Sequence, residues 1–174
     1  GAEPNVVCPS GFWGFHHRLG LPFTAGQGEV RAAVPAANGL KLAIHLSTDP
    51  AFVRRESHVT RLEQIHAGWT RSDTRKAAFA SLKQQGWHVV YFYCHGGIDA
   101  GKPVLKVGPD PKGNKHNITS AGLRAREVAW KAPGPLVFIN GCETTALEPD
   151  VAMDFVRAFM QAARASGVGG TEVA

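Results

Sequence analysis

Trp87 to Tyr93, with the sequence WHVVYFY, is the stretch that indicates the fold most directly. It is short, apolar without alternation, and rich in β-branched and aromatic side chains. Such a run is typical of a strand that is covered on both faces, as in a parallel sheet. Pro135 to Asn140 (PLVFIN) has the same character. Buried strands that alternate with helices predict βαβ units, and hence an α/β fold with a mostly parallel sheet flanked by helices.

Turn and cap signals place the other elements around these two strands. A Ser-Thr-Asp-Pro turn ends one further strand candidate, and Ser, Thr, Asp and Gly residues mark the ends of helices. The proline of Glu148-Pro149 suits the first position of a helix. The expected elements are a strand over Leu40–Leu46, a helix between Ser72 or Asp73 and Gly86, a loop or hairpin over Ile98–Asn117, a helix from Thr119 or Ser120 to about Trp130, a helix from Glu148-Pro149 to Gly167 and a strand from Val168 to Ala174.

The composition is that of one globular domain. The chain has 174 residues, of which 44% are hydrophobic and 19% charged, and these values exclude a disordered chain and a coiled coil. No apolar run approaches the ~18 residues that cross a bilayer, so no membrane contact is expected. Residues 1–39, rich in Gly, Pro and Ala, are expected to form an irregular lead-in, and residues 40–174 the folded domain.

The net charge and the cysteine content bear on nucleic-acid binding and on the cellular location. The net charge of +5 comes from basic residues scattered along the sequence, so direct nucleic-acid binding is not expected. The three cysteines are too few for a disulfide framework, and a cytoplasmic location is expected.

Two reactive side chains follow the two buried strands. His95 comes just after the first and Cys142 just after the second. Because catalytic groups collect at the carboxyl ends of parallel strands, neighbouring strands would bring the imidazole and the thiol together. An imidazolium stabilises the thiolate, and the N–H groups of Gly96 and Gly97, with that of Cys142, could bind an oxyanion.

Less reactive interpretations stay open at this point. His95 alone is more often a structural histidine, and Cys142 alone an inert core thiol. Cys94 is expected to be buried filler. A zinc site from these residues and His116 would lack paired ligand spacing, so no metal is expected.

The same residues resemble a known family. YFYCHGG (Tyr91–Gly97) followed by VFINGCET (Val137–Thr144) is similar to the CHAT family, caspase-like peptidases of the clan that also holds separases, gingipains and metacaspases. The similarity extends to segments before, between and after these motifs, which are CPSGFWGFHH (Cys8–His17), ITSAGLRARE (Ile118–Glu127) and GVGGTEV (Gly167–Val173).

The resemblance implies a caspase-like three-layer sandwich and a cysteine endopeptidase with a Cys–His dyad. It carries His95 over as general base or imidazolium partner, Cys142 as nucleophile, and Gly96 with the Cys142 amide as the oxyanion site. Family members often act in bacterial defence or regulated proteolysis, behind tetratricopeptide repeats or other sensor modules. A protein substrate and an activating partner are therefore expected, and no cofactor.

The chain departs from the family pattern in two ways. Relatives that select Arg or Lys often carry an acid two residues before the cysteine, where this chain has Asn140. Asp49 is then the leading acid for the specificity pocket, and cleavage after an uncharged residue is an equal alternative. The terminal GVGGTEVA resembles a strand just begun, so the C-terminal part of the fold is expected to be missing from this chain. The further candidates for substrate binding are Glu143 and Asp154, then Asp99 and Asp150.

Two other functions remain open on the sequence. One is a caspase-like scaffold for protein–protein contact in which the dyad is idle. The other is a thiol acyl-transfer enzyme that is not a peptidase, which would share the dyad but need a small-molecule pocket.

Overall fold

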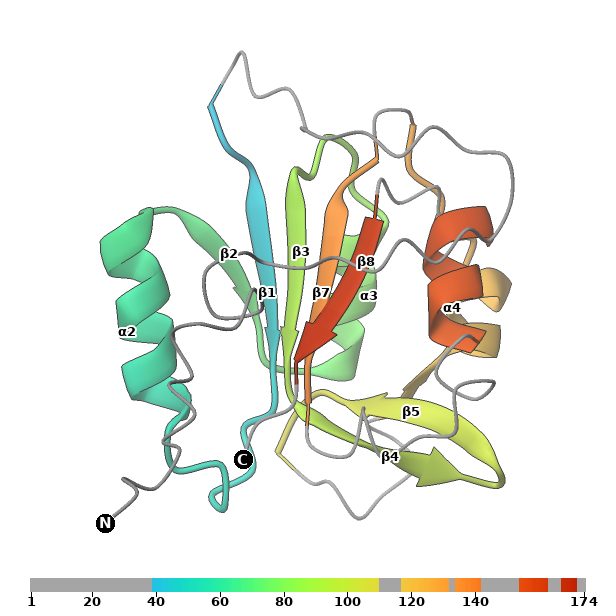
Figure 1. Ribbon diagram of the computed structural model, residues 1–174, viewed down its shortest axis with the longest axis horizontal. Helices are drawn as coiled ribbons and strands as arrows, with labels where there is room; N and C mark the ends of the chain where they lie inside the picture. The colour runs from blue at the N-terminus through green and yellow to red at the C-terminus, as the bar shows by residue number, and fades with distance from the viewer. Residues whose placement is uncertain (1–38, 110–116, 132–133, 142–153, 163–166, 172–174) are drawn as a thin grey trace, which may run out of the picture.

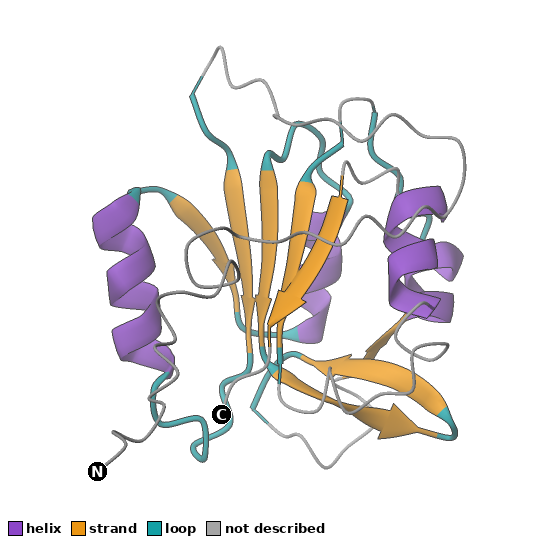
Figure 2. Cartoon of the chain, in the orientation of Figure 1, coloured by secondary structure: helices purple, strands orange, loops and turns teal. Residues whose placement is uncertain are grey.

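A parallel five-stranded sheet forms the centre of the molecule. The computed structural model describes residues 39–109, 117–131, 134–141, 154–162 and 167–171. The strand order is β2-β1-β3-β7-β8, and every neighbouring pair is parallel (Figures 1 and 2). The strands are β1 (Leu42–Leu46), β2 (Trp69–Ser72), β3 (Val89–Tyr93), β7 (Leu136–Asn140) and β8 (Gly167–Thr171).

Helices cover both faces of this sheet. α2 (Arg55–Ile65) lies on one face, which we call the α2 face. α3 (Arg75–Leu82), α4 (Ser120–Ala125) and the π-helical turn η3 (Ala158–Ala162) lie on the other, the α3 face. The result is three layers, which confirms the predicted α/β class and agrees with a caspase-like sandwich. Among the described helices none is long and apolar enough to span a membrane.

β3 is buried on both faces, which explains its unbroken apolar sequence. β7 was expected to be covered in the same way, but its Phe138, on the same face as Tyr91, is 40% exposed. On the α3 face, Val90 and Phe92 of β3 join one hydrophobic core with α3, α4 and η3. On the α2 face, Tyr91 and Tyr93 pack with α2 and with Ile44 of β1 in a second core. Alternate residues of one strand therefore serve different cores, as the two-residue period of a strand requires.

A small antiparallel sheet stands beside the ends of the parallel strands. It has the order β4-β5-β6 and consists of β4 (His95–Asp99), β5 (Lys102–Lys106) and β6 (Asn117–Thr119). Leu105 and Ile118 bury this sheet against the core of the α3 face. The loop or hairpin expected over Ile98–Asn117 is thus a hairpin, and it begins already at His95.

Threonine side chains begin two of the helices. Thr74 accepts a hydrogen bond from Ala77 N before α3, and Thr119 accepts one from Gly122 N before α4. The first cap lies within two residues of the expected one, and the second is an expected residue. α4 ends at Ala125, before the predicted Trp130, since Glu127 adopts a positive φ of 56°.

α2 and β2 were not predicted from the sequence. α2 buries only Val59 and has no side-chain cap, and β2 exposes two of its four residues. Neither segment therefore carries a strong periodic pattern. The helix expected from Pro149 is described only over 154–162, and the strand expected at Val168 is β8, from Gly167 to Thr171.

His45 predicts how stability depends on pH. The imidazole is fully buried beside Phe92, and neither ring nitrogen has a hydrogen-bond partner among the described residues. Burial lowers the pKa of His45 from 6.5 to about 3. Because the unfolded chain then binds the extra proton, stability is lost as pH falls below ~6.5, by about 3 kcal/mol at roughly pH 4.

Urea unfolding at neutral and acidic pH tests this effect. His45→Leu should flatten the pH dependence and leave stability at neutral pH equal or higher, because it removes two buried nitrogens that lack partners. His66→Leu, at the end of α2, is the control and should keep the dependence. An unchanged dependence in His45→Leu would contradict the assignment.

Candidate functional site

Three strands end at the same level of the sheet. Leu46 of β1 lies opposite Tyr93 of β3, and Tyr93 lies opposite Asn140 of β7. Backbone hydrogen bonds continue this alignment past the strands, with Ser47 N to Tyr93 O at 3.0 Å and Cys94 N to Asn140 O at 3.3 Å. The chain segments that follow these strands therefore leave the sheet at one edge, where β4 begins (Figure 1).

His95 meets an acidic residue at this edge. Its Nε2 lies 3.1 Å from Oδ2 of Asp49, and the two side chains are 23% and 15% exposed. The ring of Phe52 packs against the imidazole, with ring centroids 4.9 Å apart. The carboxylate fixes Nε2, so Nδ1 is the nitrogen left for proton transfer. A carboxylate in this position orients an imidazole.

The turn after β1 holds Asp49 in place. Its Oδ1 accepts a hydrogen bond from Ala51 N at 3.0 Å, and its carbonyl accepts one from Phe52 N at 2.9 Å. Gly108 runs alongside, where its N–H donates to Leu46 O and its carbonyl accepts from Thr48 N. Gly108 has a φ of 120°, which favours glycine. The carboxylate is thus set by backbone contacts on both sides.

The contact with His95 was not predicted for Asp49 from the sequence. From the sequence, Asp49 was the leading acid for a specificity pocket. No residue was assigned to orient the His95 ring. The structure brings Asp49 onto His95. Its part in substrate binding is not tested by this contact and stays a prediction.

Strand pairing distinguishes the two glycines after His95. Gly96 lies opposite Leu105, Gly97 opposite Val104, and Ile98 opposite Pro103. Pro103 has no N–H, so Ile98 and Pro103 cannot be a hydrogen-bonded pair. Hydrogen-bonded and non-hydrogen-bonded pairs alternate along an antiparallel ladder, so Gly97 and Val104 form a hydrogen-bonded pair. The N–H of Gly97 is therefore used by β5. The N–H of Gly96 points the other way, toward the side of β4 on which no described strand pairs with it.

A second polar group, which sequence reasoning missed, lies on the α2 face. The Tyr91 hydroxyl is 2.8 Å from His58 Nε2 and accepts a hydrogen bond from Asn140 Nδ2 at 2.7 Å. Burial raises the pKa of Tyr91, and burial together with Arg61 lowers the pKa of His58. The hydroxyl accepts from Asn140, so its own proton is available to His58 in the tautomer that leaves Nε2 unprotonated. No sequence motif marks this network, because its three members lie on α2, β3 and β7.

The remaining predicted acids do not join His95 among the described residues. Ser120 donates to Asp154, and Arg124 lies 4.0 Å from the same carboxylate, so Asp154 ties the last helix to α4. Asp99 accepts a hydrogen bond from Asn117 Nδ2 at 2.9 Å within the small sheet. A role of Asp154 in substrate binding stays a prediction. Cys142, Glu143 and Asp150 lie outside the described residues.

Two further expectations concern cysteine and metal. Cys94 is fully buried in the core of the α3 face, as expected. The described residues hold no group of three or more His, Cys, Asp or Glu side chains that could bind a metal ion. His116 is outside those residues, as is Cys142, so the zinc alternative is untested.

Tyr91→Phe should lower the free energy of unfolding by about 1–2 kcal/mol, because it leaves His58 Nε2 and Asn140 Nδ2 without a partner. A double-mutant cycle with His58→Leu, followed by urea unfolding, measures the coupling. The two changes should not be additive, because they remove the same hydrogen bond. Strict additivity would show that the bond contributes nothing.

The chain is similar to a known protein over nearly the whole of its own length. No protein-family profile matches the chain. A protein of Vitiosangium sp. (strain GDMCC 1.1324) that is named a probable protease is 47% identical over 186 aligned positions, which cover 98% of this chain. The chain spans only 23% of the length of that relative.

Proposed function

We propose that this chain is the catalytic portion of a cysteine endopeptidase of the CHAT type, with Cys142 as nucleophile and His95 as its proton partner. The observation that carries the proposal is the His95–Asp49 pair at the end of β3, beside the end of β7. Cys142 follows β7 by the same two residues that separate His95 from β3. A thiol at that sheet edge would meet an imidazole that is already oriented.

The proposed reaction follows from these positions. The Cys142 thiolate attacks the scissile carbonyl carbon, while the N–H groups of Gly96 and Cys142 stabilise the oxyanion. His95 delivers the proton from Nδ1 to the leaving amine, and the peptide remains as a thioester on Cys142. Water then attacks the thioester, gives its proton to His95 and releases the acid and the thiolate. Asp49 keeps Nε2 engaged throughout and holds the ring.

The relative supports peptide-bond hydrolysis, since it is named a probable protease and the similarity covers 98% of this chain. Regulation by a partner or sensor module is part of the proposal, because the relative extends far beyond the region that this chain matches. The protein substrate and a role in bacterial defence follow from the family resemblance. A cytoplasmic location also belongs to the proposal.

Cleavage of a diverse peptide mixture by the full-length protein, read by mass spectrometry, tests the activity. Cys142→Ala and His95→Ala should abolish the new peptide termini, while circular dichroism shows an intact fold. Thiol-independent cleavage would contradict the proposal. An unchanged peptide mixture, both alone and with the partner proteins of the native complex, would instead favour the idle scaffold.

Asp49→Asn separates orientation of His95 from substrate binding. If Asp49 orients the ring, kcat should fall about ten- to a thousandfold with little change in KM, and Asp49→Glu should recover part of the loss. The rate of Cys142 alkylation at neutral pH should fall as well. Glu63→Gln, which makes the same change at an exposed acid of α2, is the matched control. A rise in KM alone, confined to substrates with a basic P1 residue, would place Asp49 in the specificity pocket instead.

A further inference from the structure

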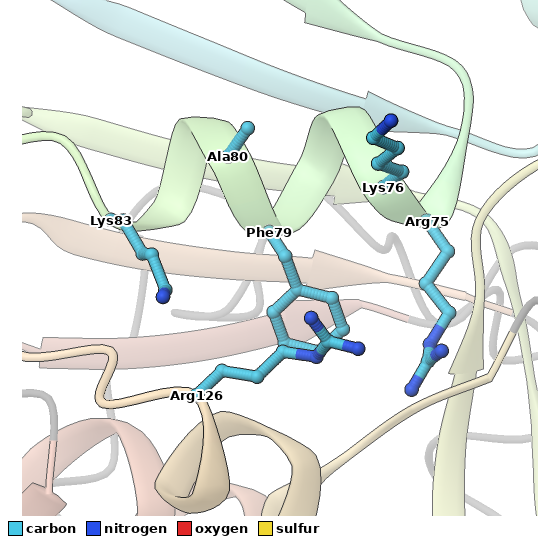
Figure 3. A pocket seen from close by; sticks show the side chains of 6 residues that line it. All are labelled: Arg75, Lys76, Phe79, Ala80, Lys83 and Arg126. Carbon is cyan, nitrogen blue, oxygen red and sulfur yellow. The ribbon is translucent and has the colours of Figure 1, made fainter.

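A cavity of about 350 Å³ lies between α3 and the end of α4, away from the α2 face (Figure 3). Four of the residues around it are positively charged, and none is acidic. The lining consists of Arg75, Lys76, Phe79, Ala80, Lys83 and Arg126. Three of these cations lie on α3 or at its end, and Arg126 joins them because α3 and α4 pack on the same face of the sheet.

Phe79 organises the two guanidinium groups. The Arg126 guanidinium lies 4.6 Å from the centre of the Phe79 ring, and that of Arg75 lies 5.2 Å from it. Figure 3 shows the Arg126 group in front of the ring. Stacking of this kind orients the flat guanidinium, so its N–H groups have a restricted geometry before any ligand arrives. Phe79 is itself only 3% exposed, so the ring offers no open face to a ligand.

No acidic side chain is among the described residues that line the cavity. In the part of the chain that the structure describes, the ion pairs involve other cations, and none of these four forms one. Arg75 also has a buried Nε without a hydrogen-bond partner. Burial and the nearby charge of Arg126 lower the pKa of Arg75. The site thus holds like charges close together, which a bound anion would stabilise.

The number and type of cations define the anion. Guanidinium groups bind phosphate oxygens in pairs, and lysine ammonium groups add point charges. A phosphoryl group carries up to about two negative charges, so two of them balance four cations. We propose that this cavity binds a small molecule with two or more phosphoryl groups. Because the Phe79 ring is covered, the phosphates rather than an aromatic base provide the recognition.

Isothermal titration calorimetry of the purified protein with pyrophosphate and with ADP tests this inference. Both ligands should bind with similar affinity, and added salt should weaken both. ADP binding without pyrophosphate binding would overturn recognition through phosphates. Binding only to nucleic acid or to acidic peptides would likewise overturn it and identify a macromolecular surface.

Matched variants locate the site. Lys76→Gln with Lys83→Gln removes two exposed charges and should weaken pyrophosphate binding by at least about tenfold, while the fold stays intact. Arg61→Gln with Arg157→Gln removes the same charge elsewhere and should have little effect. Arg126→Lys, which keeps the charge but loses the planar group, should also weaken binding. Equal loss in the lysine pair and the control pair would overturn the site.

Discussion

The shared register of β1, β3 and β7 is the constraint on which the candidate site depends. Both faces of β3 are buried, so a slip of one residue would turn Tyr91 and Tyr93 toward the α3 face and Phe92 toward α2. The two cores together prevent that slip. Because the register is fixed, the chain leaves all three strands at one level, and the Asp49 turn reaches His95.

The sequence was most informative where burial leaves a continuous apolar pattern. WHVVYFY and PLVFIN identified two central strands and the parallel sheet, and the His95 position followed from the first. α2 and β2 were missed for the opposite reason. α2 rests on the sheet through few apolar side chains, and the pairing of β2 with β1 supplies much of what holds that strand. Interactions that come from pairing rather than from side-chain pattern are not visible in a single sequence.

The same reason explains what could be foreseen of the candidate site. His95 stands beside a strand end and was found from local sequence. Its partner Asp49 is 46 residues away, and several other acids were equally plausible by spacing. Only the pairing of β1 with β3 selects Asp49. The His58–Tyr91–Asn140 network is a further case, because it joins α2, β3 and β7 through side chains with no shared motif.

Local arrangement, rather than net charge, decides the electrostatics of this molecule. The chain carries +5, yet His95 meets a carboxylate at 3.1 Å. Exposed charges farther away than the Debye length of roughly 10 Å are largely screened, so the net charge of the chain says little about the surroundings of one side chain. α3 and its C-cap carry three basic residues, and the packing of α3 against α4 brings Arg126 to the same cavity. Among the described residues, the fold thus places an acid beside His95 and leaves these four cations outside any ion pair. The first arrangement suits proton transfer, and the second suits the binding of an anion.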